Sequence, residues 1–186
     1  MIVFFLCSAL AGLSVKIMDD WLDRERDGPR PTFATRLGDA SLPYALLSFA
    51  CAVPFDPATA VALLLMSYAA GMGGRALRDV YPSGLRGWQE SLFAVIISVG
   101  ACGWRLTTVA GLCIAAIQGI DDVMDWRNRG PSAAPLVRRF GVIEVAAGTI
   151  AAVLFALGLD IPRTFGVIMG AAFIWCLEAL CYNVDL

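Results

Sequence analysis

Long apolar runs, separated by short charged or Pro/Gly-rich segments, limit most strongly what this chain can fold into. A helix needs about 20 mostly apolar residues to cross a bilayer, and several runs approach that length. The pattern predicts seven helices, at 2–18, 41–54, 57–74, 89–104, 106–122, 141–158 and 164–182. Of the 186 residues, 59% are hydrophobic and 16% charged, against about 45–50% and 25% in soluble domains. We therefore predict an all-α membrane protein, one domain over 1–186 with about seven transmembrane helices.

The basic residues are distributed unevenly between the two sides of such a bundle. If the seven helices alternate in direction, eleven of the 14 basic residues fall on one side: Arg24, Arg26, Arg30, Arg36, Arg75, Arg78, Arg86, Arg127, Arg129, Arg138 and Arg139. Positive charge gathers in cytoplasmic loops, so the segments that carry these arginines are expected on the cytoplasmic side of a bacterial-type inner membrane. The first run lacks the basic start of a signal peptide, and we expect it to be part of the mature structure.

A twelve-residue segment occurs twice in the chain. "MDDWLDRERDGP" starts at residue 18 and "IDDVMDWRNRGP" at residue 120, and the two align without a gap at an offset of 102. The identical positions are Asp19, Asp20, Asp23, Gly28 and Pro29, which fall on Asp121, Asp122, Asp125, Gly130 and Pro131. Both copies follow an apolar helix, and the two helices are predicted to run in the same direction. The recurrence predicts two parallel repeats, roughly 1–88 and 89–186, that share one site.

The spacing of the acids places them on one face of each helix. Asp20, Asp23 and Asp27 stand at i, i+3 and i+7, and Asp122 and Asp125 repeat the first step. Carboxylates at the end of a span are costly and normally face a bundle interior or a water-filled cavity. Several carboxylates facing each other need a cation, and oxygen ligands favour Mg²⁺, which bridges carboxylates to a phosphate substrate. The five aspartates are therefore predicted to bind Mg²⁺.

A simpler interpretation is that nearby cations neutralise these acids at the lipid headgroups. Lys16 precedes Asp20 by four residues, Asp20 precedes Arg24 by four, and Asp125 precedes Arg129 by four. Such pairs form along a helix without any ligand.

The rest of the composition narrows the chemistry. The chain has no histidine, which removes the commonest metal ligand and general base. Its six cysteines include no CxxC pair and lie in or beside apolar stretches, which argues against a disulfide framework or structural zinc. A formal net charge of −2 gives no reason to expect nucleic acid as a partner.

At the two acidic segments the sequence resembles the UbiA superfamily of intramembrane prenyltransferases. The family's first motif has the form N/D-D-x-x-D-x-x-x-D, and "DDWLDRERD" matches it, most closely in the manner of the chlorophyll-synthase branch. A second acidic motif follows in the family after about a hundred residues, and "RNRGPSAAPLVRRFG" is similar to the segment that trails it.

The resemblance implies a UbiA-like helical bundle that transfers a polyprenyl group from its diphosphate to a lipid-soluble acceptor within the membrane. The catalytic residues and Mg²⁺ ligands would be Asp20, Asp23, Asp27, Asp122 and Asp125. Candidate substrate-binding residues are Lys16, Asp19, Asp121, Arg75, Arg78, Tyr81, Arg86 and Arg129. The central arginines have a plainer interpretation, in which they only set the topology.

Three departures from the family pattern leave a second function open. Seven helices are predicted where the family usually has nine, Arg129 stands where a third acid is expected, and the central break lacks a Tyr-x-x-x-Lys pattern. The alternative is a non-catalytic relative, a subunit of a larger membrane complex that binds a lipid or pigment tail. A transporter or channel is a third possibility, although its acids would be expected in mid-span.

Overall fold

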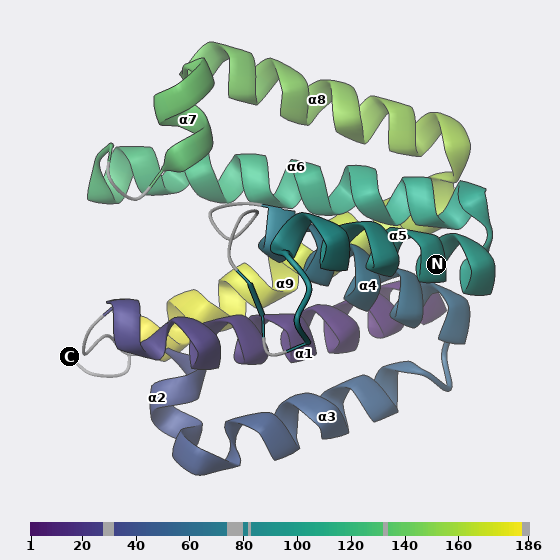
Figure 1. Ribbon diagram of the computed structural model, residues 1–186, viewed down its shortest axis with the longest axis horizontal. Helices are drawn as coiled ribbons and strands as arrows, with labels where there is room; N and C mark the ends of the chain where they lie inside the picture. The colour runs from purple at the N-terminus through teal and green to yellow at the C-terminus, as the bar shows by residue number, and fades with distance from the viewer. Residues whose placement is uncertain (28–31, 74–79, 82, 132–133, 184–186) are drawn as a thin grey trace. The chain divides into compact units, whose positions relative to one another are not determined.

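All the regular elements that the structure describes are helices. The computed structural model describes residues 1–27, 32–73, 80–81, 83–131 and 134–183. In chain order the elements are α1 (Ile2–Asp27), α2 (Phe33–Leu37), η1 (Gly38–Ala40), α3 (Ser41–Ala52), α4 (Pro57–Gly73), α5 (Gly87–Cys102), α6 (Trp104–Arg129), α7 (Pro135–Phe140), α8 (Val142–Leu159) and α9 (Ile161–Asn183) (Figure 1). Each of the seven predicted helices overlaps one of these, so the all-α prediction is confirmed. The short helices α2 and α7 were not predicted.

The prediction of seven spans is wrong for the described residues. Four helical segments are long and apolar enough to cross a membrane: Ile2–Leu22, Trp104–Arg129, Val142–Leu159 and Ile161–Cys181. Helices α3, α4 and α5 have 12, 17 and 16 residues. A helix rises 1.5 Å per residue, so twelve residues reach only about 18 Å into a hydrocarbon core about 30 Å thick.

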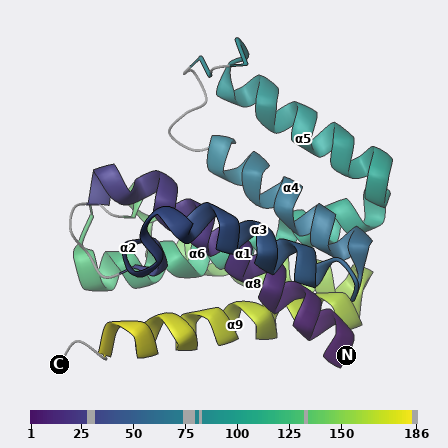
Figure 2. The same ribbon diagram turned by 90° about the horizontal axis from the view of Figure 1, so that it is seen from below.

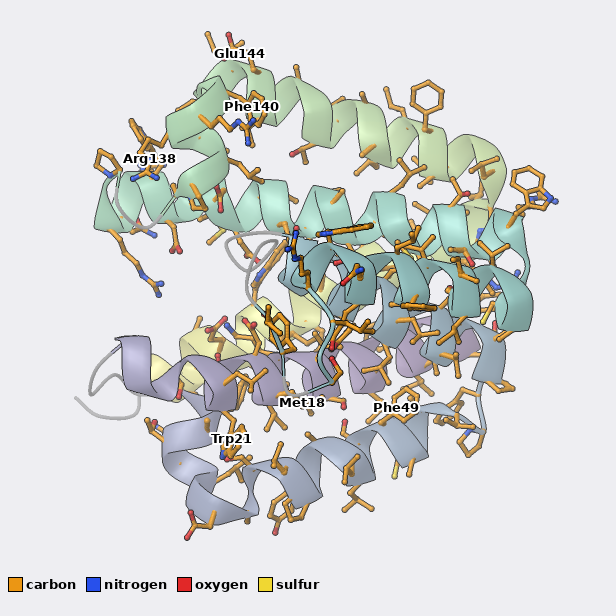
Figure 3. The ribbon with its side chains drawn as sticks, viewed as in Figure 1. Met18, Trp21, Phe49, Arg138, Phe140 and Glu144 are labelled. Atoms are coloured by element: carbon orange, nitrogen blue, oxygen red, sulfur yellow. The ribbon has the colours of Figure 1, made fainter. Side chains whose placement is uncertain are left out.

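The chain forms two compact units. The first unit is Met1–Leu64 with Phe165–Leu186, and the second unit is Leu65–Thr164. In the first unit α1 lies beside α3, with α2 joining their ends (Figure 1). Figure 3 places Met18 and Trp21 of α1 on the side facing α2 and α3, and Phe49 of α3 on the side facing α1.

Small residues bring α9 close to α1 in the first unit (Figure 2). A Cβ atom added at Gly170 would lie 2.9 Å from the backbone nitrogen of Ala9, and one at Gly166 would lie 2.9 Å from the carbonyl carbon of Phe4. The rings of Phe5 and Phe173 meet edge to face at 5.9 Å. Close approach at glycine is how helices pack where lipid removes the hydrophobic drive for association.

The second unit has a similar core. Helix α6 lies beside α8, with α7 joining them, and α5 packs along α6 (Figure 1). A Cβ atom at Gly119 of α6 would collide with Thr149 of α8, which explains the small residue there. The C-terminal part of α4 lies beside α5, where the Ser91 hydroxyl donates to the carbonyl of Ala69 at 2.9 Å (Figure 2).

The elements recur along the chain at the offset of the sequence repeat. Helix α6 begins and ends 102 residues after α1, and both contain 26 residues. Helix α7 begins 102 residues after α2, and α8 begins 101 residues after α3. Asp56 and Asp160 then hold the starts of α4 and α9, accepting from the backbone N–H groups of Thr59 at 3.2 Å and Arg163 at 3.1 Å. Both acidic helix ends therefore have the same local framework, a long helix followed by a short one.

Candidate functional site

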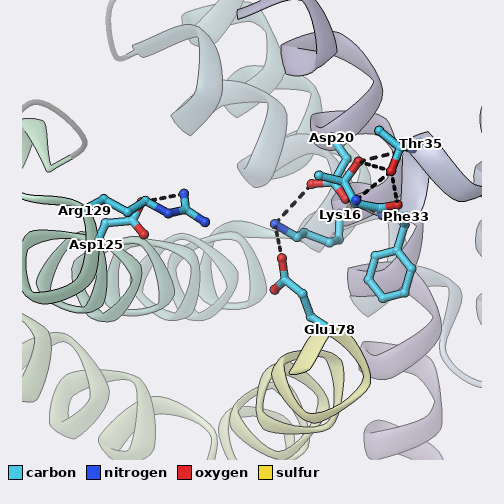
Figure 4. A network of polar contacts seen from close by, with 8 residues as sticks. Lys16, Asp20, Phe33, Thr35, Asp125, Arg129 and Glu178 are labelled. Carbon is cyan, nitrogen blue, oxygen red and sulfur yellow. Dashed lines mark hydrogen bonds and ion pairs between the residues drawn. The ribbon is translucent and has the colours of Figure 1, made fainter. Parts of the chain in front are cut away.

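The first acidic helix end is held by three charged side chains. The Lys16 ammonium lies 3.2 Å from Oδ1 of Asp20 and 3.1 Å from Oε1 of Glu178, which comes from α9 (Figure 4). The side chain of Asp20 is 7% exposed, that of Glu178 18% and that of Lys16 31%. A buried carboxylate requires a partner of this kind, and Lys16 supplies it to two acids at once.

Asp20 also fixes the start of the next helix. Its Oδ2 accepts from the backbone N–H of Phe33 at 3.1 Å, at the first residue of α2 (Figure 4). Thr32 caps the same helix, its hydroxyl accepting from the N–H of Thr35 at 3.2 Å. Helix starts carry N–H groups without intrahelical partners, and a carboxylate is well suited to accept from them. Both oxygens of Asp20 therefore have partners.

The second acidic helix end repeats part of this arrangement. Oδ2 of Asp122 accepts from the backbone N–H of Leu136 at 2.6 Å and of Val137 at 3.4 Å, at the start of α7. Asp125 pairs with Arg129, whose Nη1 lies 3.3 Å from Oδ2 (Figure 4). Asp20 and Asp122 thus have the same role in their own unit, each bonding to the short helix that follows.

The two ends differ at the position one turn before the aspartate. Lys16 of the first end corresponds to Gln118 of the second, at the repeat offset. Gln118 lies in the wall of an apolar cavity of about 490 Å³ between α4, α5 and α6. Met66, Trp88 and Leu92 line the same cavity. A neutral amide therefore faces the space at the second end, whereas the first end holds an ammonium.

The face of α6 that lines the cavity also carries the two aspartates. The residues of this face are spaced alternately four and three apart: Gly111, Ala115, Gln118, Asp122 and Asp125. Residues at these spacings share one helix face. An apolar space and two carboxylates are thus adjacent within the second unit.

The other predicted site residues differ in how exposed they are. Asp19 and Asp121 are exposed, Tyr81 is half-buried, and Arg86 is exposed at the start of α5. The backbone N–H of Tyr81 donates to the carbonyl of Leu85 at 2.9 Å, in the turn before α5. The side chains of Asp23 and Asp27, and the whole of Arg75 and Arg78, lie outside the described residues.

Two acids with structural partners were not among the predicted residues. Glu178 pairs with Lys16, and Glu90 of α5 accepts hydrogen bonds from the hydroxyls of Tyr68 and Ser83. Both signals were present in the sequence, because each is an acid inside an apolar helix, and such residues normally have a polar partner. Their partners come from other elements, which a local pattern does not reveal.

Carboxylates are the type of ligand that binds a hard cation. The described carboxylates, however, are not grouped around one point. Among the side chains that the structure describes, no three acids or cysteines lie close enough to hold a metal ion. The carboxylates of Asp20 and Asp125 instead contact the cationic groups of Lys16 and Arg129. Positive charge is therefore what these acids attract, and an incoming metal ion would have to displace a side-chain cation.

Comparison with known proteins finds no relative of this chain. No family model, curated protein or solved structure matches the chain. The fold and the site therefore rest on the residues themselves.

Proposed function

We propose that the chain is a membrane-embedded prenyltransferase of the UbiA type, which transfers a polyprenyl group from its diphosphate to a lipid-soluble acceptor with Mg²⁺. The observation that carries this proposal is the face of α6, which lines the apolar cavity up to Gln118 and carries Asp122 and Asp125 at the next positions along the helix. A polyprenyl diphosphate has the same two parts, an apolar chain and an anionic head. The cavity, at about 490 Å³, lies within the roughly 300–1,000 Å³ of small-molecule sites.

The repeated acids would hold the metal in this proposal. Asp122 and Asp125 would act with Asp20, Asp23 and Asp27 of the other repeat, as the duplicated motif predicts. Bound Mg²⁺ would neutralise the charge that develops on the diphosphate as it leaves. Lys16 and Arg129, now paired with the acids, would turn to the diphosphate oxygens when the metal ion enters.

The remaining predicted residues complete the proposed site. Arg75, Arg78 and Arg86 would contact the diphosphate, Tyr81 would face the acceptor, and Asp19 and Asp121 would border the substrate. The charge asymmetry supports a bacterial-type inner membrane with both acidic ends in the cytoplasm. Reporter fusions placed just after each acidic helix end test that orientation, which predicts a cytoplasmic location for both reporters.

The direct test is donor binding by the purified full-length chain. Geranylgeranyl diphosphate should bind in the presence of Mg²⁺, and Asp122→Asn should lower its affinity about tenfold or more, because it removes the negative charge of one proposed Mg²⁺ ligand. Asp39→Asn is the matched control, because Asp39 is an exposed acid of η1 that is not among the proposed site residues. A donor affinity that does not depend on Mg²⁺, or that both variants change equally, would reject the proposal.

A second candidate is favoured by the ion pairs. Asp20 and Asp125 each contact a cation of their own helix, as expected of acids that only need neutralising. The chain would then be a non-catalytic UbiA-like subunit of a larger membrane complex, with the cavity holding a lipid or pigment tail. Purification from its native membrane at fixed stoichiometry with other subunits, without diphosphate release from any donor, would favour this function over the first.

A further inference from the structure

Besides the apolar cavity, the second unit has a groove that lies away from its acidic helix end. It has a volume of about 620 Å³ and lies between the N-terminal half of α6 and the C-terminal half of α8. Its walls are Thr108, Leu112, Leu154, Phe155, Gly158 and Leu159. Both helices are among those apolar enough to cross a membrane, so lipid chains are the surroundings expected for this face.

A cation stands at one end of this groove. Nε of Arg105 donates to the carbonyl of Leu159 at 3.1 Å, and its Nη2 donates to the same oxygen. Because Leu159 lines the groove, the guanidinium lies at the groove's end. A guanidinium carries five N–H donors, and these two bonds leave others for a ligand.

The charge of Arg105 is not neutralised within the described part of the chain. No carboxylate among the described residues pairs with it. Arg163, the neighbouring cation at this end of the unit, instead lies 2.9 Å from Oδ2 of Asp160. An exposed arginine with an apolar groove beside it is complementary to an anionic head with an apolar tail.

A tryptophan beside Arg105 is the residue type expected at a membrane interface. Trp104 precedes Arg105 and is 66% exposed, and tryptophan is enriched where the hydrocarbon meets the headgroups. From Arg105 to Leu112 the axis of α6 rises about 10 Å, so the groove extends from that level into the hydrocarbon. Phe155, 70% exposed on α8, borders it on the lipid side.

We propose that this groove binds an acyl chain of an anionic phospholipid, whose phosphate is held by Arg105. The site is separate from the proposed diphosphate site and does not depend on any transfer reaction. Phosphatidylcholine carries the same phosphate, but the ammonium of its choline cancels the net charge of the headgroup, so the structure predicts that Arg105 favours a lipid with a net negative charge. The expected preference is about fivefold, because one basic residue contributes about that factor toward an anionic lipid.

The test is native mass spectrometry of the detergent-purified full chain, titrated with phosphatidylglycerol and with phosphatidylcholine of identical chains. One phosphatidylglycerol should bind about fivefold more tightly than phosphatidylcholine. Gly158→Leu should weaken both lipids about tenfold, because a Cβ atom there meets nothing within 4 Å and the new side chain fills the groove. Gly148→Leu is the matched control, a substitution at an equally open glycine of α8 outside the groove.

The headgroup contact is tested separately. Arg105→Gln should abolish the preference for phosphatidylglycerol while phosphatidylcholine still binds, and Arg105→Lys should keep the preference through its charge. The lysine variant also shows whether loss of the bond to Leu159 alone matters. Equal binding of both lipids to the unsubstituted chain, an equal effect of Gly158→Leu and Gly148→Leu, or a groove filled by a second copy of the chain would overturn the proposal.

Discussion

The two acidic helix ends contain the same motif and use it differently. In the first unit Asp20 is buried, and Lys16 joins it to Glu178 of α9. In the second unit Asp122 bonds, among the described residues, to backbone N–H groups, and Gln118 takes the place of Lys16 beside an apolar cavity. The first copy is thus held by an ion-pair network, whereas the second lies on a helix that borders an apolar cavity.

The largest expected effect comes from removing the ammonium that joins α1 to α9. Lys16→Met leaves Asp20 and Glu178 without their shared cation, and we expect the free energy of unfolding to fall by about 2–4 kcal/mol. This lies below the full cost of a broken buried pair, because Lys16 is partly exposed. Unfolding in detergent, followed by loss of helical circular dichroism, measures it.

Gln118→Met is the matched control, since it places the same side chain at the equivalent position of the second end. Gln118 has no charge to leave unpaired, so the change should be less than about 0.5 kcal/mol. Equal effects at the two positions would contradict the contrast between the ends.

Neutralising the whole network should recover most of the loss. In the triple variant Lys16→Met, Asp20→Asn and Glu178→Gln, none of these three side chains is charged, and the amide that replaces the Asp20 carboxylate keeps an acceptor oxygen for the N–H of Phe33. We expect its free energy of unfolding to exceed that of Lys16→Met by about 1–3 kcal/mol. A triple variant less stable than the single one would show that these side chains act independently.

Filling the apolar cavity at the second acidic end should weaken binding of the donor's polyprenyl chain and leave binding of its diphosphate head unchanged. Ala115 lines the cavity on α6. Ala115→Phe should lower the affinity for geranylgeranyl diphosphate about tenfold, or about 1.4 kcal/mol, while inorganic pyrophosphate still binds. Calorimetric titration measures both ligands, and Ala147→Phe, at an exposed site of α8, is the control. Equal losses for both ligands would mean that the cavity does not hold the chain.

The smallest effect is expected at the exposed pair of the second end. Arg129 is 42% exposed and Asp125 30%, so Arg129→Gln should change the free energy of unfolding by less than about 1 kcal/mol. That small difference should disappear in high salt, where surface charges are screened. Arg127→Gln on the same turn should show no salt-dependent difference, and unfolding at two ionic strengths tests both.

Much of the fold follows from local patterns, and the contacts of the site do not. Long apolar runs located all seven of the longer helices, but they also predict a span at the short run 41–54, and the helix α3 that forms there has only 12 residues. Helices α2 and α7, of five and six residues, are too short to show a period. The bonds that Asp20 and Asp122 make to them could not be predicted either.

The ion pairs were predictable only within a helix. The sequence indicates Lys16 with Asp20 and Asp125 with Arg129, because each pair is four residues apart, and both pairs form. The pair of Lys16 with Glu178 joins residues far apart in the chain and depends on how α9 packs against α1. The predicted pair of Asp20 with Arg24 involves a side chain outside those described.

The central proposal, which comes from the repeated acidic motif, is that both helix ends contribute carboxylates to one site. Leu22 and Met124 are exposed, stand at equivalent positions of α1 and α6, and can each carry a spin label after cysteine substitution in a chain whose native cysteines are replaced. Double electron–electron resonance would then measure the distance between the labels in detergent or nanodiscs. If the two ends contribute to one site, the labels should lie less than about 30 Å apart, their own length included, and this distance should narrow when Mg²⁺ and pyrophosphate are added. A distance of about 40 Å or more, unchanged by both ligands, would contradict the shared site.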